Sequence, residues 1–519
     1  MQDASIASGG DLFAGYELGG FFDEVFEGPG LIRRHYEGLL ERIRSLPPEE
    51  LGRRERLRDA AFRSQGITFT VYGEAAGLER TFPMDLLPRI IPGSEWARVE
   101  RGLIQRVTAL NRFLDDLYTG ERAVLHDGVV PRWLVISAEG YLRAADGIAV
   151  PHGARCLVAG IDLVRDATGR YVVLEDNLRN PSGISYVLEN RVAMTRVLPV
   201  AFSQYRVRAV NHYAALLNQA LVDVAPHAAG NPTVVVLTPG VHNSAYFEHA
   251  FLARQMGVEL VEGRDLVVDD HVVYMRTTRG LRQVHVIYRR IDDAYLDPVV
   301  FRPDSGLGVP GLLAAARAGN VTIANAVGNG VADDKAVYAY VPELIRYYLG
   351  EEPQLDSVDT YLLWDPEQRA TVLDRLHELV VKPVAESGGY GMLMGPSASE
   401  EELAAFRTRI EADPRGYIAQ EVVQLSRHPT LVGDHLEGRH VDLRPFVITG
   451  ERTQVLPGGL TRVALREGSL VVNSSQGGGS KDTWVLLDDR AHVDGRADAD
   501  RPAMGGIPPD EDGDGRGGA

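Results

Sequence analysis

Residues 160 to 182, with the sequence GIDLVRDATGRYVVLEDNLRNPS, constrain the fold of this chain more than any other segment. Two runs of alternating apolar and β-branched residues, 156–165 and 170–175, flank a short run, 166–169, whose residues accept a sharp bend. This pattern predicts a β-hairpin. The chain is therefore expected to form an antiparallel strand pair at this point.

Three oxygen-bearing side chains of this hairpin form a candidate magnesium site: Asp162, Glu175 and Asn177. With the strands paired directly across 166–169, Asp162 lies opposite Val173, and the two-residue period of a strand places Glu175 and Asn177 on the same face. Asp162 and Glu175 are then diagonal neighbours, roughly 7–8 Å apart at the backbone, and can close around one small hard cation. The alternative is an ordinary acidic strand end that faces solvent.

A second segment, residues 377–394, reads HELVVKPVAESGGYGMLM and predicts a strand that delivers Lys382 to a glycine-rich loop. Gly388, Gly389 and Gly391 leave the backbone N–H groups free to approach anionic oxygens, and a strand-end lysine adds a point charge. The pattern is not GxxxxGK[ST], so a Walker-type NTPase is disfavoured. The alternative is a hairpin loop with a surface lysine.

Residues 416–424, GYIAQEVVQ, predict an apolar strand that carries Gln420 and Glu421. Such a strand can offer backbone donors and acceptors to the edge of an adenine ring, while Val422 and Val423 cover its faces. Taken alone, it is only a core strand.

The set of segments resembles the ATP-grasp superfamily once DLR at 442–444 and GGLTR at 458–462 are added. In most members the E-x-N segment follows the arginine-bearing strands, whereas here it precedes them. The chain therefore resembles a circularly permuted ATP-grasp protein, an arrangement shared with glutathionylspermidine synthetase. From about Thr70 to Val485 it is similar to the circularly permuted type 2 ATP-grasp family, in segments such as VLEDNLRNPSGISYVLENR and VADDKAVYAYVPELIRYYLGEEP.

The resemblance implies a set of ligands for Mg²⁺ and ATP. The metal would be held by Asp162, Glu175 and Asn177. Lys382 would contact the α- or β-phosphate, and Lys335 would reach the nucleotide. A flexible lid would contain Gly388, Gly389 and Gly391. The adenine would be framed by Gln420, Glu421 and Val423. A helix-entry lysine such as Lys335 is otherwise often solvated.

The resemblance also implies catalytic arginines, Arg444 and Arg462, because a guanidinium suits the spread negative charge of a transferring phosphoryl group. Arg179 is a third candidate if its strand continues that far. Glutathionylspermidine synthetase has an arginine two residues before the metal aspartate, whereas this chain has Gly160. We expect Arg179 or Arg165 to replace that arginine.

The run Tyr288-Arg289-Arg290 resembles the Y-x-R of glutathione synthetases, in which the arginine binds a peptide substrate. Arg289 or Arg290 is therefore expected to bind a substrate carboxylate. The alternative is a pair of surface arginines that form ion pairs with Asp292 and Asp293.

Composition limits the class of protein. The chain has 519 residues, 45% of them hydrophobic, and a net charge of −18, which argues against nucleic acid and anionic membranes as partners. It has one cysteine, no signal peptide and no apolar run of 18 residues, so a cytoplasmic location is expected.

The expected fold is α/β (α+β), a circularly permuted ATP-grasp core with an α/β, Rossmann-like pre-ATP-grasp subdomain. The expected domains are an extension (1–69), the first core part with the metal hairpin (70–229), the α/β subdomain (230–330), the nucleotide-binding part (331–487) and a disordered acidic tail (488–519). The turn that follows TVVVL lacks G-x-G-x-x-G, which disfavours a dinucleotide site.

Residues 80–118 predict a proline-broken loop followed by an amphipathic helix with apolar Leu103, Val107 and Leu110 on one face. Arg89, before this helix, is expected to face either substrate or solvent.

The function implied by the resemblance is an ATP- and Mg²⁺-dependent ligase. It would convert a peptide-like or amino-acid-like carboxylate to an acyl phosphate, which an amine attacks to give an amide. No Ser-His-Asp or Cys-His arrangement competes with this interpretation. Two alternatives remain open: a kinase on the same scaffold, and a non-catalytic nucleotide-binding partner of peptide-processing proteins.

Overall fold

The computed structural model describes residues 12–13, 15–70, 79–226, 230–386, 391–433, 435–470, 472 and 478–488. The predicted disordered tail after 488, and the lid residues Gly388 and Gly389, lie outside the described residues. Gly391 is described, with φ at +68°, a left-handed conformation that favours glycine.

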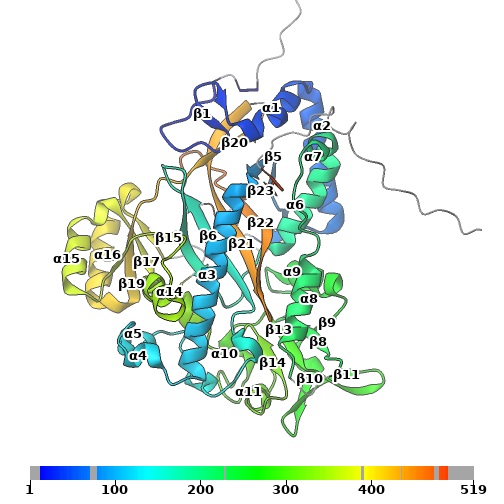
Figure 1. Ribbon diagram of the computed structural model, residues 1–519, viewed down its shortest axis with the longest axis vertical. Coiled ribbons are helices and arrows are strands. Elements are labelled where there is room, and N and C mark those ends of the chain that lie inside the picture. The colour runs from blue at the N-terminus through cyan, green and yellow to red at the C-terminus, as the bar shows by residue number, and fades with distance from the viewer. Residues whose placement is uncertain are drawn as a thin grey trace, which may run out of the picture.

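An eight-stranded, mainly antiparallel sheet forms the centre of the molecule (Figure 1). Its strand order is β15-β7-β6-β21-β22-β23-β5, and β20 also pairs with β21. The bounds are β15 Asp356–Ser357, β7 Tyr171–Asn177, β6 Val158–Arg165, β21 His435–Thr449, β22 Thr453–Val463, β23 Gly479–Val485, β5 Met84–Ile91 and β20 Arg427–Val432. The sheet draws strands from both the 70–229 and the 331–487 segments, whose boundaries stay predictions.

Helices cover both faces of this sheet (Figure 1). The predicted amphipathic helix is α3, Gly93–Tyr118, and it buries Leu103, Val107 and Leu110 against sheet residues such as Leu163 and Leu443. The opposite face packs on α6 (Ile184–Val197) and α8 (Tyr213–Asp223). Alternation of side chains along the strands explains why both faces are apolar and buried.

Two smaller sheets flank the central one. The antiparallel sheet β16-β19-β17-β18 comprises Thr360–Leu362, Tyr417–Glu421, Leu379–Pro383 and Leu393–Met394, and it packs on α15 (Pro366–Asp374) and α16 (Glu400–Ala412). The parallel sheet β14-β13-β8-β9 comprises Thr322–Ala324, Val286–Arg289, Val234–Leu237 and Glu259–Val261. With α9 (Tyr246–Met256), it confirms the βαβ character expected of residues 230–330.

The remaining strands are β1 Phe26–Gly28, β2 Leu31–Ile32, β3 Thr68–Thr70, β4 Glu79–Thr81, β10 Leu266–Asp269, β11 Val272–Thr277 and β12 Gly280–Gln283. The remaining α-helices are α1 Glu37–Arg44, α2 Pro48–Gln65, α4 Ala123–His126, α5 Arg132–Ile136, α7 Pro199–Gln204, α10 Asp293–Leu296, α11 Leu312–Arg317, α12 Gly330–Asp333, α13 Lys335–Tyr338 and α14 Val341–Leu349. Within the described ranges, every helix is too short or too polar to cross a bilayer.

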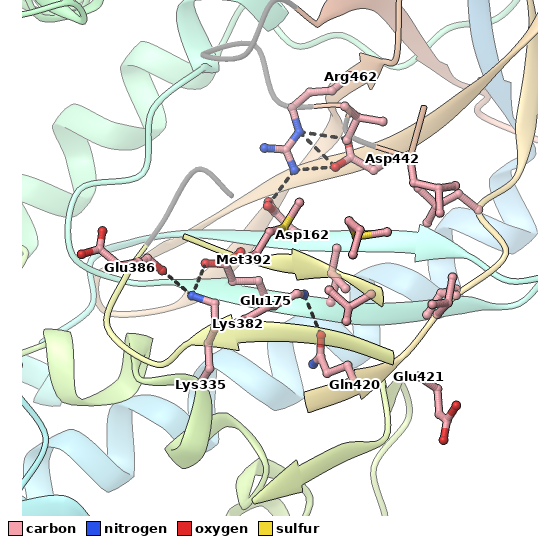
Figure 2. Close-up of a pocket in the computed structure, with 18 of the residues that line it drawn as sticks. Asp162, Glu175, Lys335, Lys382, Glu386, Met392, Gln420, Glu421, Asp442 and Arg462 are labelled. Atoms are coloured by element: carbon pink, nitrogen blue, oxygen red, sulfur yellow. Dashed lines mark hydrogen bonds and ion pairs between the residues drawn. The ribbon is translucent and has the colours of Figure 1, made fainter. Parts of the chain in front are cut away.

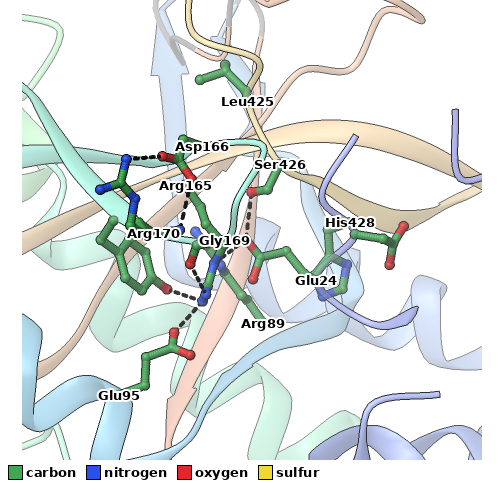
Figure 3. Close-up of polar contacts among 12 residues, drawn as sticks. Glu24, Arg89, Glu95, Arg165, Asp166, Gly169, Arg170, Leu425, Ser426 and His428 are labelled. Carbon is green, nitrogen blue, oxygen red and sulfur yellow. Dashed lines mark hydrogen bonds and ion pairs between the residues drawn. The ribbon is translucent and has the colours of Figure 1, made fainter. Parts of the chain in front are cut away.

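One buried carboxylate, that of Glu24, connects the N-terminal segment to the end of the central sheet (Figure 3). We call Glu24 and its partners Arg89, Arg165 and Ser426 the Glu24 cluster. Glu24 Oε1 accepts hydrogen bonds from Arg89 Nη2 at 2.5 Å, Arg165 Nε at 3.2 Å and Ser426 Oγ at 2.6 Å. Arg89 has no exposed surface, so both sequence-based alternatives for this residue, contact with substrate and contact with solvent, are wrong.

Candidate active site

A pocket lies between the central sheet and the small antiparallel sheet (Figure 2). Its empty volume is about 910 Å³, including the open mouth. The polar part of its lining comes from both sheets and from the start of α13: Asp162, Glu175, Lys335, Lys382, Gln420, Asp442 and Arg462. Apolar side chains complete the walls, among them Leu174, Val380, Met392, Met394, Val423 and Leu425.

The hairpin predicted from the sequence is confirmed, but a β-bulge changes its register. β6 and β7 are antiparallel, and the pairing shifts by one residue between Asp162 and Leu163. Asp162 therefore faces Glu175 directly instead of diagonally. Val173, predicted on the same face as Asp162, instead packs in the core. The extra residue, Leu174, absorbs the shift and leaves Glu175 at the pocket.

The Asp162 carboxylate accepts three hydrogen bonds from two arginines, Arg444 and Arg462, and Figure 2 shows the bond from Arg462. Arg444 binds both oxygens, at 2.5 Å from Nε and 2.8 Å from Nη2, and Arg462 Nη2 donates at 2.7 Å. Burial alone would raise the pKa of Asp162, but the two guanidinium groups lower that pKa to about 2. Asp162 is therefore ionised at any physiological pH.

Asp442 was missed by the sequence prediction, although its side chain lines the pocket. It accepts a hydrogen bond from Arg462 Nη2 at 2.5 Å, so that one buried arginine joins two carboxylates. Asp442 lies opposite Arg462 in the sheet and two residues before Arg444 on β21. The D-x-R spacing on an expected strand was the signal that could have identified it, since such residues share a face.

Two lysines reach the pocket. Lys382 Nζ donates to Gln420 Oε1 at 2.6 Å, and burial lowers the pKa of this amine to about 8. Lys335 Nζ lies 3.1 Å from Glu175 Oε1 and donates to the backbone carbonyl of Glu386 at 2.5 Å. The alternative of a solvated Lys335 is wrong, because its side chain is only 12% exposed.

The end of β19 forms another part of the pocket. Gln420, Glu421 and Val423 all contribute to the lining, and the chain leaves the sheet after Glu421. The Glu421 carboxylate accepts hydrogen bonds from Tyr361 at 2.8 Å and Arg375 at 3.0 Å, and it points away from the pocket in Figure 2. Its side chain is therefore held by Tyr361 of β16 and by Arg375, and it does not point into the pocket.

The oxygen donors of the hairpin fit a magnesium ion that is completed by a nucleotide. Asn177 ends β7, two residues after Glu175 and opposite Gly160, and it is not among the described residues that line the pocket. Its amide Oδ1 is the atom that could bind a metal, and its buried Nδ2 has no hydrogen-bond partner among the described residues. Mg²⁺ prefers oxygen ligands and is usually held by one or two carboxylates together with substrate phosphates. In the part of the chain that the structure describes, no group of three or more His, Cys, Asp or Glu residues could hold a metal by itself.

Gly160 leaves room for Arg444. A Cβ atom at Gly160 would lie 2.9 Å from Pro181 Cβ and 3.3 Å from Arg444 Cδ. The Arg444 side chain thus passes beside Gly160, whereas Arg165 and Arg179 pair with Glu24 and Asp333, so the prediction that one of these two replaces the missing arginine is wrong. Arg165 belongs to the buried Glu24 cluster instead (Figure 3).

Arg179 lies outside the pocket. β7 ends at Asn177, so the strand does not continue to Arg179 as the prediction required. Arg179 Nε donates to Asp333 Oδ2 at 2.9 Å, and Nη1 lies 3.7 Å from Asp292. Arg179 is not one of the described residues that line the pocket.

Arg289 and Arg290 are both buried, which corrects the alternative of a surface pair. Arg289 donates to the backbone carbonyls of Asn325, Ile291 and Ala326 and pairs with Asp293, which leaves it no role in binding a substrate carboxylate.

Arg290 is tied to the loop that follows the metal hairpin. Its Nη2 donates to Ser182 Oγ at 2.7 Å and lies 3.2 Å from Glu248 Oε1. Its Nε is buried without a partner in the described structure. Arg290 remains a predicted substrate contact, with one donor free.

Comparisons with known proteins give matches over most of this chain. A family model described as circularly permuted ATP-grasp type 2 matches residues 88–464. An uncharacterised protein of Synechocystis sp. is 57% identical over 472 residues, which cover 91% of this chain and 98% of that protein. A Frankia alni protein, provisionally named a glutamate–cysteine ligase, is 49% identical over 475 residues, 91% of this chain but 54% of its own length.

Among solved structures, the glutathione synthetase-like effector of Globodera pallida in its apo form has a similar fold. The TM-score is 0.52 at 13% sequence identity, and the superposition covers 85% of this chain and 98% of that chain. At this identity the likeness concerns the fold alone.

Proposed function

Since the chain belongs to the circularly permuted ATP-grasp type 2 family, we propose that it is an ATP- and Mg²⁺-dependent ligase that joins a carboxylate to an amine. The observation that carries the proposal is the pocket between two antiparallel sheets, in which two lysines and an Asp–Arg cluster meet apolar walls. Such a combination suits a nucleotide, whose base needs apolar contact and whose phosphates need cations.

The charged residues would act on the phosphates. Lys382 and Lys335 would contact them as point charges, and Arg444 and Arg462 would stabilise charge on the transferring phosphoryl group. Bound Mg²⁺, held by Asp162, Glu175 and Asn177, would neutralise the phosphate oxygens. A carboxylate oxygen beside the γ-phosphate would attack the γ-phosphorus and release ADP, which gives an acyl phosphate. An amine would then attack the acyl carbon and release phosphate and a proton, which gives an amide.

The substrate class rests on the relatives. The name of the Frankia protein points to an amino-acid carboxylate and an amino-acid amine, but the match spans about half of that protein. We therefore propose amino-acid-like or short peptide-like substrates in general, and a cytoplasmic location as expected from the sequence.

The test is turnover of ATP with Mg²⁺ in the presence of a panel of amino acids, short peptides and polyamines. We expect ADP and free phosphate to appear in equal amounts with one acid–amine pair, and Glu175→Ala to abolish both. ADP without phosphate would make the enzyme a kinase. Nucleotide binding without turnover under any condition would favour a non-catalytic binding module.

The reactivity of the lysine side chains offers an independent check of the nucleotide site, because the chain contains only three lysines: Lys335, Lys382 and Lys481. With a pKa lowered by burial to about 8, Lys382 should react with an acylating reagent at a rate that rises with pH and is half-maximal near pH 8. MgATP should protect Lys382. Lys481 is buried and binds Asp85 at 2.5 Å, so it should stay unmodified.

Peptide mass mapping after timed exposure to the reagent measures each lysine separately. A midpoint near the ordinary lysine value of 10.5, or reaction of Lys382 that MgATP does not slow, would contradict the assignment of Lys382 to the nucleotide site.

A further inference from the structure

Lys335 holds together three parts of the candidate active site. It is the first residue of α13, and its backbone N–H donates to the Val384 carbonyl at 3.1 Å. Its ammonium bridges Glu175 on the metal hairpin and the Glu386 carbonyl, which directly precedes the glycine-rich segment (Figure 2). The side chain that is expected to contact ATP thus forms an ion pair with a carboxylate that is expected to bind the metal.

The two candidate metal carboxylates are held very differently. Asp162 accepts three N–H groups from Arg444 and Arg462, which leaves about one of its roughly four acceptor positions free. Glu175 accepts from one ammonium and is 20% exposed. A bidentate guanidinium holds a carboxylate in a fixed geometry, whereas an ammonium is a point charge on a flexible stem. Glu175 is therefore the carboxylate whose partner is readily exchanged.

The charge balance of the pocket disfavours a bare metal ion. Three carboxylates, Asp162, Glu175 and Asp442, face four cations, Lys335, Lys382, Arg444 and Arg462. The carboxylates of Glu386 and Glu421 point away from this cluster in Figure 2. A divalent cation would thus enter a cluster with an excess of positive charge, and a triphosphate reverses that sign.

The presence of a lysine rather than an arginine at position 335 supports the idea that Glu175 can exchange its partner. Of 54 lysine and arginine residues in the chain, only three are lysines, and two of these line the pocket. Apart from Lys481, which pairs with Asp85, the chain uses arginine for its other cationic side chains of this kind. An arginine at position 335 would bind Glu175 bidentately and would hold it more firmly.

We propose that Lys335 gates the metal site. Its ammonium holds Glu175 until a nucleotide binds and then transfers to the phosphates, so that Glu175 becomes a metal ligand only in the nucleotide complex. The proposal rests on the proposed function, since it requires that the pocket bind a nucleotide.

Mn²⁺ binding to the full-length protein tests the gate without any turnover, with the electron paramagnetic resonance signal of free Mn²⁺ as the readout. In the absence of nucleotide, Lys335→Met should bind Mn²⁺ at least about tenfold more tightly than the wild type, because a positive charge beside Glu175 is removed. The added substitution Glu175→Gln should cancel this gain.

Two matched variants separate a gate from a general charge effect. Lys382→Met removes a positive charge from the same pocket, but its amine binds Gln420 and not Glu175, so the gain should stay below about threefold. Lys335→Arg keeps the charge and can hold Glu175 bidentately, so it should bind Mn²⁺ no more tightly than the wild type.

Equal gains from Lys335→Met and Lys382→Met, or no gain from Lys335→Met, would overturn the gate. Binding of a fluorescent ADP analogue to the wild type separates the two levels of the argument. If the analogue binds but Lys335→Met leaves the affinity for Mn²⁺ unchanged, only the proposed gate is wrong. If the analogue does not bind, the proposed function is wrong as well.

Discussion

Replacing Arg444 with methionine should lower the rate of ADP release by about 10²–10³-fold, the loss typical when one preorganised donor to a transition state is removed. Arg444 lies across Gly160 and binds Asp162 through two hydrogen bonds, so it both contributes positive charge and fixes a candidate metal ligand. Steady-state kinetics with a saturating acid–amine pair is the measurement. Arg444→Lys should recover little, because an ammonium cannot bind Asp162 bidentately.

Arg179→Met is the matched comparison. The sequence interpretation treated Arg179 as a third catalytic arginine and therefore predicts a similar loss. The structure places it against Asp333 and away from the pocket, so we expect less than about a threefold change in the rate. A loss as large as that of Arg444→Met would show that Arg179 moves to the phosphates during the reaction. It would contradict the inference that Arg179 lies outside the active site.

Replacing Glu24 with alanine should destabilise the fold by about 3–5 kcal/mol, the usual effect of removing one partner from a buried ion pair. Glu24 is the carboxylate that Arg89 binds, and Arg89 is fully buried. Arg165 keeps Glu95 as a partner, so the penalty falls mainly on Arg89. The shift of the urea denaturation midpoint, followed by tryptophan fluorescence, measures the effect. If Glu24→Ala does not fold, the isosteric Glu24→Gln supplies the comparison.

Glu50→Ala is the control for Glu24, since Glu50 makes two ion pairs on the surface, with Arg53 and Arg54. Exposed pairs contribute little to stability, so its midpoint should shift far less. Equal shifts for the two variants would contradict the structural role of the Glu24 cluster.

The stabilisation from Glu24 should also depend on pH. Burial would raise the pKa of Glu24, but Arg165 and Arg89 lower that pKa from 4.5 to about 2. Because the pKa is lower in the folded protein, the stabilisation is fully present above about pH 4.5 and is lost as the pH falls toward 2. Wild type should therefore lose more stability than Glu24→Gln over this range.

Much of the candidate site could be predicted because its motifs are local. The hairpin of β6 and β7, the strand that carries Lys382 and the strand that carries Gln420 each show a pattern within a few residues. The structure brings Asp162, Glu175, Lys335, Lys382 and Arg462 to one pocket, as the resemblance to a known family implied. Their roles stay predictions until the experiments above are done.

The register of the hairpin could not be predicted. A bulge at Leu174 depends on what packs on each face of the sheet. It places Val173 in the core and leaves Glu175 at the pocket, although a regular strand would put both residues on one face.

The sequence by itself determined the family, the types of secondary structure and the residues with the right chemistry, because side-chain periodicity and short motifs are properties of neighbouring residues. Only the tertiary structure decided which arginine meets which carboxylate. Arg444 binds Asp162 although the two residues are 282 positions apart in the sequence. Arg289 also lies in a motif that suggests a substrate contact, but its guanidinium donates to backbone carbonyls instead. The partner of a buried charge is set by segments far apart in the chain, and no local pattern records that choice.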